Sequence, residues 1–252
     1  MAGLAHDWPE TRQTCVDILC AYLRLPYDPD PGDADPDKRT AYRANREVRH
    51  TIIRLIGMHL RPDELRDKNA VESWQGLNLD FTGVVFDGGA FTYARFSFGT
   101  VSFSGAEFSG GRVDFTGAEF SIGLVDFTGA EFSGGTVDFL IAKFSGGVDF
   151  SGAEFSGGTV RFSGAEFSRG TVDFGGAVFF RGAGSSGGAE FSGGLVDFVG
   201  AKFSGGTVDF RGARRWSPPP VFDFEGAPPE GLMLPAGAMP GRPDSLGSET
   251  AG

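Results

Sequence analysis

The chain has 252 residues, of which 40% are hydrophobic, so it is long enough to bury a core. It contains 41 Gly and 26 Phe but 3 Trp and 4 Tyr, a bias typical of internal repetition. The formal net charge of −11 argues against sequence-independent binding to nucleic-acid phosphates, which requires clustered Lys and Arg. No direct nucleic-acid binding is therefore expected.

Residues 1–76 have an ordinary composition and the spacing of amphipathic helices. In PETRQTCVDILCAYLR, residues 9–24, apolar residues recur every three or four positions, which predicts a helix. Residues 41–62 predict a second helix that ends at Pro62. Its expected apolar face consists of Val48, Ile52, Leu55, Ile56 and His59. The acidic, proline-rich stretch DPDPGDADPD between the two helices predicts a solvated loop.

The two cysteines predict a reducing environment. Cys15 and Cys20 are five residues apart on the first predicted helix, roughly 140° around its axis, so we expect no disulfide between them. The chain has no run of 18 or more apolar residues, and its first 25 residues lack the pattern of a secretion signal. We therefore expect a cytoplasmic protein without a transmembrane segment.

Residues 77–213 repeat a five-residue unit centred on Phe. The stretch VDFTGAEFSGGTVDF, residues 125–139, shows two such units, a two-residue insertion and the start of a third. Side chains alternate along an extended segment, so each Phe and the small residue two before it should point inward and the acid between them outward. The glycine that follows permits a corner. Each unit is therefore predicted to be one short strand and one corner, stacked on an earlier unit.

These consecutive units resemble the bacterial pentapeptide-repeat family over residues 79–212. The resemblance implies an all-β solenoid, a right-handed quadrilateral β-helix with four units per coil. Insertions after alternate units predict about 24 residues per coil instead of 20. We expect a helical region and cap at 1–76, the β-helix at 77–213, and a Pro/Gly-rich, mostly disordered segment at 214–252.

A 24-residue coil, shortened once to 23, places Phe over Phe in columns. One column starts at Phe91 and one at Phe96. The other two are the predicted structural core: Phe103, Phe127, Phe150, Phe174 and Phe198, and Phe108, Phe132, Phe155, Phe179 and Phe203. Ser186 stands where a Phe belongs, so we expect a core irregularity there, either a cavity or an inward turn. Residues near the other end are expected to cover it: Trp216, Val221, Phe222 and Phe224.

The sequence predicts no catalytic, cofactor or metal site. Paired catalytic acids need burial of one partner, whereas alternation places the acids of the repeat outside. His6, His50 and His59 lack the spacing of metal ligands, and the glycine-rich stretches precede extended segments instead of a helix. We therefore expect a protein that is not an enzyme and that binds no cofactor.

One outward column consists of aspartates alone and is the candidate interaction surface. Its residues, about 4.8 Å apart along the solenoid, are Asp126, Asp149, Asp173 and Asp197. The other acidic columns are interrupted by Lys143, Arg161 or Lys202. A moderate negative charge also serves solubility alone, so a merely solvated face stays an alternative.

The expected function is a non-enzymatic structural scaffold that binds an unidentified protein partner, and a homodimer is left open. In the resembling family some members are DNA mimics that bind type II topoisomerases such as gyrase, which gives one alternative. The N-terminal segment is similar to a region that follows transmembrane helices in many bacterial relatives, so a membrane-associated accessory protein is another. The helices either offer Arg43, Arg46, Arg49 and Arg54 to an acidic partner or only cap the first coil.

Overall fold

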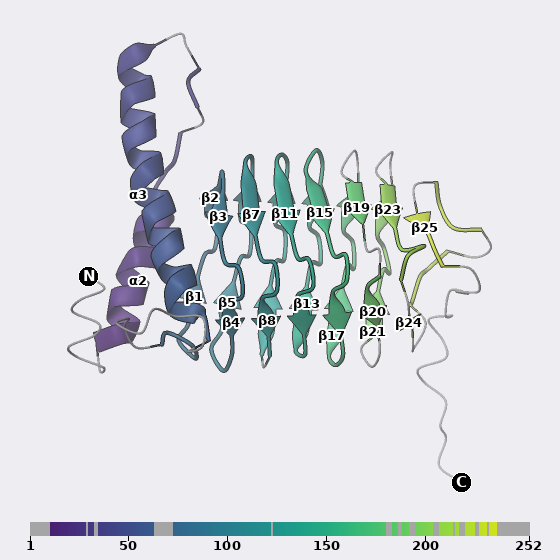
Figure 1. Cartoon of the computed structure of the whole chain (residues 1–252). Helices are drawn as coiled ribbons and strands as arrows, with labels where there is room; N and C mark the ends of the chain where they lie inside the picture. Colours follow the sequence, from purple (N-terminus) through teal and green to yellow (C-terminus); the bar gives the residue numbers. More distant parts are fainter. Residues whose placement is uncertain are drawn as a thin grey trace.

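The chain folds into two helices followed by a four-sided β-solenoid of about five turns (Figure 1). The helices are α2 (Arg12–Leu23) and α3 (Pro36–Leu60). The computed structural model describes residues 11–28, 30–32, 35–62, 73–121, 123–179, 183–185, 188–191, 195–203, 207–213, 215–216, 220–224, 227–230 and 232–235.

Short parallel strands form four sheets, which we name faces A to D in the order in which the chain visits them. Face A contains β1 (Leu79–Asp80), β5 (Val101–Ser102), β9 (Leu124–Asp126), β13 (Gly147–Asp149), β17 (Thr171–Asp173) and β21 (Leu195–Asp197). Face B contains β2 (Val85–Phe86), β6 (Glu107–Phe108), β10 (Glu131–Phe132), β14 (Glu154–Phe155), β18 (Val178–Phe179) and β22 (Lys202–Phe203).

Faces C and D complete each coil. Face C contains β3 (Gly89–Ala90), β7 (Arg112–Asp114), β11 (Thr136–Asp138), β15 (Thr159–Arg161), β19 (Ala183–Ser185), β23 (Thr207–Asp209) and β25 (Leu232–Met233). Face D contains β4 (Arg95–Phe96), β8 (Glu119–Phe120), β12 (Lys143–Phe144), β16 (Glu166–Phe167), β20 (Glu190–Phe191) and β24 (Arg215–Trp216). A corner is named by the two faces that it joins.

The register between coils confirms the repeat of about 24 residues. On face A, Val125 pairs with Val101 before it and with Val148 after it, so the shortened connector leaves the column intact. The pairing of Leu79 with Val101 shows that the first coil is shorter. The five-residue unit, not the coil length, is therefore the element that the sequence keeps constant.

Phe side chains fill the interior as parallel stacks. Phe127 is fully buried, with ring centroids 4.7 Å from Phe103 and 4.9 Å from Phe150. All ten predicted ladder residues lie in two such stacks, in which neighbouring centroids are 4.5 to 5.0 Å apart. This spacing matches the distance between hydrogen-bonded strands, so backbone pairing brings the rings into contact. Ser186 lies outside the described residues.

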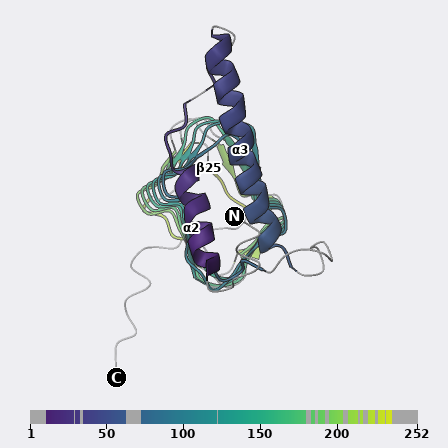
Figure 2. The ribbon, with the colours of Figure 1, turned by 90° about the vertical axis from the view of Figure 1, so that its left-hand side faces the viewer.

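The predicted helices are present, but α3 begins earlier and buries a different face. Asp35 caps its N-terminus by accepting hydrogen bonds from the N–H groups of residues 37 and 38, and Pro36 takes the first helical position, so the predicted loop ends two residues early. Ile53 is buried in place of Val48, which is 45% exposed. The reason is that α3 turns the side with Arg49 and Ile53 toward the first coil, and its N-terminal part extends beyond the outline of the solenoid (Figures 1 and 2).

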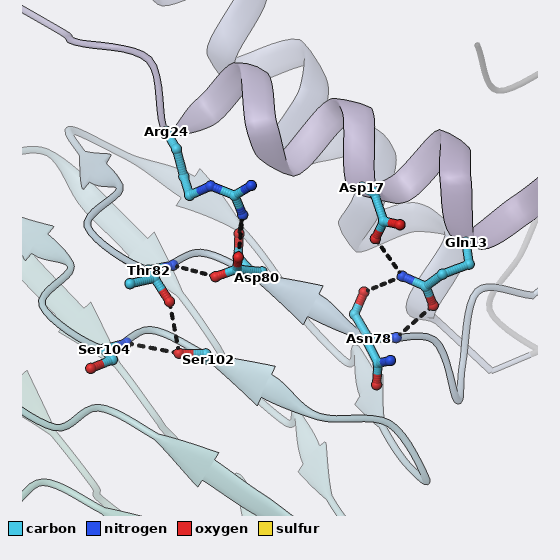
Figure 3. A network of polar contacts seen from close by, with 8 residues as sticks. All are labelled: Gln13, Asp17, Arg24, Asn78, Asp80, Thr82, Ser102 and Ser104. Carbon is cyan, nitrogen blue, oxygen red and sulfur yellow. Dashed lines mark hydrogen bonds and ion pairs between the residues drawn. The ribbon is translucent and has the colours of Figure 1, made fainter.

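The helices cover the open strand edges of the first coil. α2 packs against β1, and α3 packs against β3 so closely that a Cβ atom on Gly57 would overlap the carbonyl oxygen of Ala90. The side-chain amide of Gln13 donates to the carbonyl oxygen of Asn78 and accepts from its backbone N–H, at 2.9 Å each (Figure 3). A neighbouring strand would make the same two hydrogen bonds.

Arginines of the helices complete this edge pairing. Arg24 donates to the carbonyl oxygen of Asp80, and Arg61 donates to that of Thr92. Arg49 donates to the carbonyl oxygen of Val85 at 2.9 Å and is buried, so the prediction that it is available to an acidic partner is wrong. Side chains thus satisfy backbone groups that would otherwise form an unpaired sheet edge.

At the other end, the solenoid continues past residue 213. Strand β24 pairs with β20, and β25 pairs with β23. Val221 bridges to Asp197, and the ring of Phe222 stacks on Phe198 at 5.0 Å. The prediction of a mostly disordered segment from residue 214 is therefore wrong for these residues. Strand pairing uses backbone groups, which allows a proline-rich segment without the five-residue pattern to extend the coil. The side chain of Trp216 lies outside the described residues.

Neither helix in the described part of the chain combines the length and the apolar character that crossing a membrane requires.

Replacing one ring within a stack should be far more costly than replacing a ring at its end. Phe127→Ala leaves a cavity between two rings, and we expect it to lower the free energy of unfolding by about 3–5 kcal/mol. Phe203→Ala removes the same atoms from a half-buried ring at the end of its described stack and should cost clearly less. Urea denaturation followed by circular dichroism measures both losses, and equal losses would contradict a core built from continuous stacks.

Candidate interaction surface

The four predicted aspartates stack on face A. Asp149 pairs in register with Asp126 and with Asp173, and Asp173 pairs with Asp197. Each is half-buried. Each Oδ1 atom accepts a hydrogen bond, at 2.7 to 2.8 Å, from the backbone N–H two residues later in the corner. The column therefore has a structural role, because each carboxylate holds its own corner closed.

The same local hydrogen bond occurs on other parts of the solenoid, so it explains why the repeat places Asp before Phe. Asp80 accepts from the N–H of Thr82, and Asp114 accepts from that of Thr116. The sequence signal for this role is the position of Asp two residues before a corner residue, because the donor is a backbone N–H that Thr128 and Val199 provide equally. A carboxylate that accepts one backbone donor still has a second oxygen available to solvent or a partner.

A second acidic column lies beside the aspartates. On face B, Glu131 pairs in register with Glu107 and with Glu154. The chain passes from face A to face B through a short corner, so both columns border that corner. We call these seven residues the acidic ridge: Asp126, Asp149, Asp173, Asp197, Glu107, Glu131 and Glu154. No ion pair joins them to a basic residue within the described part of the chain.

Faces C and D have basic residues among their acids. Asp138 on face C is fully buried, which corrects the expectation that every acid of the repeat points to solvent. Arg161 Nη1 lies 3.4 Å from its Oδ1, and Arg112 Nε lies 2.7 Å from its Oδ2 in an ion pair without hydrogen-bond alignment. On face D, Arg95 pairs with Glu119 at 2.9 Å. The net negative charge of the solenoid is therefore concentrated at the A–B corner.

Stacking like charges affects the middle of the aspartate column. Partial burial raises the pKa of Asp173, and the neighbouring carboxylates of Asp149 and Asp197 raise it further. The hydrogen bond from the N–H of Gly175 opposes this shift without cancelling it. The ionised column is thus under electrostatic repulsion, which a cationic partner would relieve.

A cluster around Asp87 joins α3 to the first coil. Its carboxylate accepts hydrogen bonds from Tyr27 at 2.8 Å, Tyr42 at 2.9 Å and Arg46 at 2.8 Å, and His50 Nε2 lies 2.7 Å from it. Burial opposes ionisation, but these four partners together lower the pKa of Asp87 well below its usual range. The expectation that Arg46 is available to an acidic partner is therefore wrong, since Asp87 binds it.

A groove of about 590 Å³ opens beside this cluster, between the projecting half of α3 and face B. Arg43 borders it and is exposed, and Glu107 of the acidic ridge lies on its other side. Of the four arginines that the sequence offers to a partner, Arg43 and Arg54 are exposed. The groove has acidic and basic walls, so it does not select one charge of ligand.

Within the described residues, no group of three or more His, Cys, Asp or Glu side chains could hold a metal ion. The two cysteines are free and buried. Burial raises the pKa of the Cys20 thiol to about 11, which disfavours its reactive thiolate form.

These observations define the class of protein as a four-sided parallel β-solenoid with a helical N-terminal cap. Residues 142–184 match the family model for pentapeptide repeats, which is described as nine copies. The same five-residue unit, coil register and Phe stacks extend on both sides of that match, so the solenoid is built from pentapeptide repeats. Among curated proteins none matches the chain, and none matches among solved structures.

Removing the charge of Asp173 should stabilise the protein near neutral pH. The raised pKa means that the fold favours the protonated form, so this group's contribution to stability is largest below its unfolded pKa and declines as the pH rises through its folded pKa. Asp173→Asn keeps the oxygen that closes the corner, and we expect a gain of at most about 1 kcal/mol at pH 7 that disappears near pH 3. Unfolding free energies at the two pH values test this.

The matched control is Asp126→Asn, at the end of the column, where Ser102 replaces one acidic neighbour. Its gain at pH 7 should be smaller. A loss of stability at pH 7 in Asp173→Asn would show that the column is not under repulsion.

The Asp87 cluster should respond to pH in the opposite direction. Its lowered pKa means that Asp87 contributes stability above its unfolded pKa and loses it as the pH falls through its folded pKa. Asp87→Asn leaves Arg46 and His50 without their anion, and we expect a loss of about 2 kcal/mol at pH 7 that shrinks in acid. Thermal melting across pH measures it, with the exposed Asp30→Asn as a control that should change little.

Proposed function

We propose that the protein is a non-enzymatic scaffold that binds a protein partner through the acidic ridge. The observation that carries this proposal is the uneven charge of the solenoid. The acids of face C and Glu119 of face D have arginine partners, whereas the seven acids of the ridge have no ion pair within the described residues. A partner that presents a basic surface would replace the missing cations and relieve the repulsion within the column.

The geometry of the ridge supports a protein partner. Its acids sit on backbone fixed by strand pairing, so little conformational freedom is lost when they bind. The four aspartates are also oriented by the hydrogen bonds that close their corners. A partner would therefore meet a rigid line of carboxylates with a fixed spacing of about 4.8 Å.

A second candidate is a DNA mimic that binds a type II topoisomerase such as gyrase. The ridge supports this candidate, because two parallel columns with a rise of about 4.8 Å give one negative charge per about 2.4 Å of axis. Double-stranded DNA has one charge per about 1.7 Å. The two line charges are of the same order, although the ridge is less dense.

Charge removal along the ridge tests the first candidate. We expect the tagged full chain to recover a partner from extracts of its own cells in a salt-sensitive manner. A variant with Asp126, Asp149 and Asp173 changed to Asn should lose that partner, because Asn keeps the corner hydrogen bond but not the charge. The control variant changes Asp28, Asp30 and Asp37 to Asn, which removes three exposed charges near the helices. Equal recovery by both variants would contradict the proposal.

The topoisomerase candidate makes a separate prediction. Purified protein should inhibit DNA supercoiling by gyrase, and the variant with three Asn residues on the ridge should inhibit it at least about tenfold less. If the unmodified protein has no effect at micromolar concentration, the candidate is wrong, while the more general proposal of a basic protein partner is still tested by the recovery experiment.

A further inference from the structure

Large apolar side chains are exposed along the two corners that border face D. Tyr93 and Ile141 lie on the C–D corner and are 44% and 53% exposed. Phe98 and Leu124 lie on the D–A corner and are 78% and 52% exposed. In the described part of the solenoid, Val199 is the other large apolar residue exposed to this degree, at 39%. Exposed apolar residues are thus concentrated around one face, which is a typical feature of an interaction site.

Three of these residues also adopt an unfavourable backbone conformation. Tyr93, Phe98 and Ile141 have φ angles of 57°, 66° and 50°, and they are the non-glycine residues with positive φ among those described. In the next coil on the C–D corner the equivalent position is Gly117, which adopts such an angle without strain. Tyr93 leans over that glycine, whereas Phe98 has most of its ring in solvent. The fold itself would be served better by glycine at residue 98.

The charges of face D alternate over the first four coils of the solenoid, and Glu190 in the fifth coil then repeats the charge of Glu166. Arg95, Glu119, Lys143 and Glu166 occupy successive coils of one column. The order is positive, negative, positive, negative, so the reversed order is complementary to it. If two copies face each other antiparallel, Arg95 meets the partner's Glu166 and Glu119 meets the partner's Lys143. A parallel arrangement would place like charges together.

The other columns do not have this property. On face A, and in coils two to four of face B, negative charges repeat. Two copies of either face would therefore bring like charges together, whether the copies were parallel or antiparallel. The free half of α3 projects beside β2 and β3, away from β4 and β5, so it leaves face D accessible (Figure 1). A two-fold interface needs a surface that is complementary to itself, and the first four coils of face D meet that condition.

We propose that face D is the interface of an antiparallel homodimer, with its two-fold axis between the coils of Glu119 and Lys143. The alternating charges set the register, and Phe98 and Leu124 supply apolar contacts at the border. The proposal does not rest on the acidic ridge, because none of the seven ridge residues belongs to a strand of face D. Ridge variants should therefore dimerise like the unmodified chain.

Sedimentation equilibrium of the full chain over a range of concentrations tests the proposal. We expect a dimer that weakens as salt is added. Lys143→Glu and Glu119→Lys should each weaken it by at least about tenfold, because each places like charges opposite each other twice. An equimolar mixture of these two variants should form a dimer again, since every opposed pair is then complementary. The double variant Glu119→Lys, Lys143→Glu should also dimerise.

Two controls separate the interface from general effects. Lys202→Glu makes the same change of charge on face B and should leave dimerisation unchanged. Phe98→Gly should weaken the dimer about tenfold without lowering the melting temperature, because glycine accepts the positive φ angle. A chain that is monomeric at every concentration would overturn the proposal. So would a dimer that Lys143→Glu and Phe98→Gly leave intact, or folded charge variants that fail to pair when mixed.

Discussion

Backbone hydrogen bonding between successive coils is the constraint on which the rest of the structure depends. It sets a separation of about 4.8 Å between equivalent residues of neighbouring coils. The Phe stacks adopt centroid distances of 4.5 to 5.0 Å because their backbone has that spacing. Every other side chain repeats at the same distance, so each residue must also be compatible with its equivalents in the coils before and after it. Rings benefit from this repetition, whereas carboxylates repel one another.

The chain accommodates the repulsion between carboxylates in two ways. On faces C and D it places basic residues among the acids, and the burial of Asp138 between Arg112 and Arg161 shows how far a carboxylate can enter the solenoid when cations accompany it. On face A the aspartates instead accept backbone N–H groups of their own corners, which holds them in place but adds no positive charge. The raised pKa of Asp173 is the consequence, and it marks the side of the solenoid on which a partner's cations would be most effective.

The repeat could be predicted from the sequence because its signal is redundant. A five-residue spacing fixes which residues are inside, and twenty or so repetitions outweigh local exceptions, so the coil length and the ring columns follow. The limits of the solenoid could not be predicted in this way, since the strands after residue 213 pair through their backbone without the five-residue pattern. The burial of Arg49 and Asp138 was missed for a similar reason. Alternation predicts which way a side chain points, but not which groups from another helix or coil will meet it.

Exposed residues of a repeat protein are best compared with their equivalents in neighbouring coils. The acids of face A recur because each closes a corner, so their repetition alone indicates no function; the separate observation is that no ion pair reaches them from the described residues. Phe98 is the opposite case, because neither its exposure nor its positive φ angle benefits the coil that contains it. Selection for folding alone would favour glycine there. Face D and the acidic ridge share no residue, so a dimer through face D would carry two acidic ridges and allow one assembly to engage two basic surfaces.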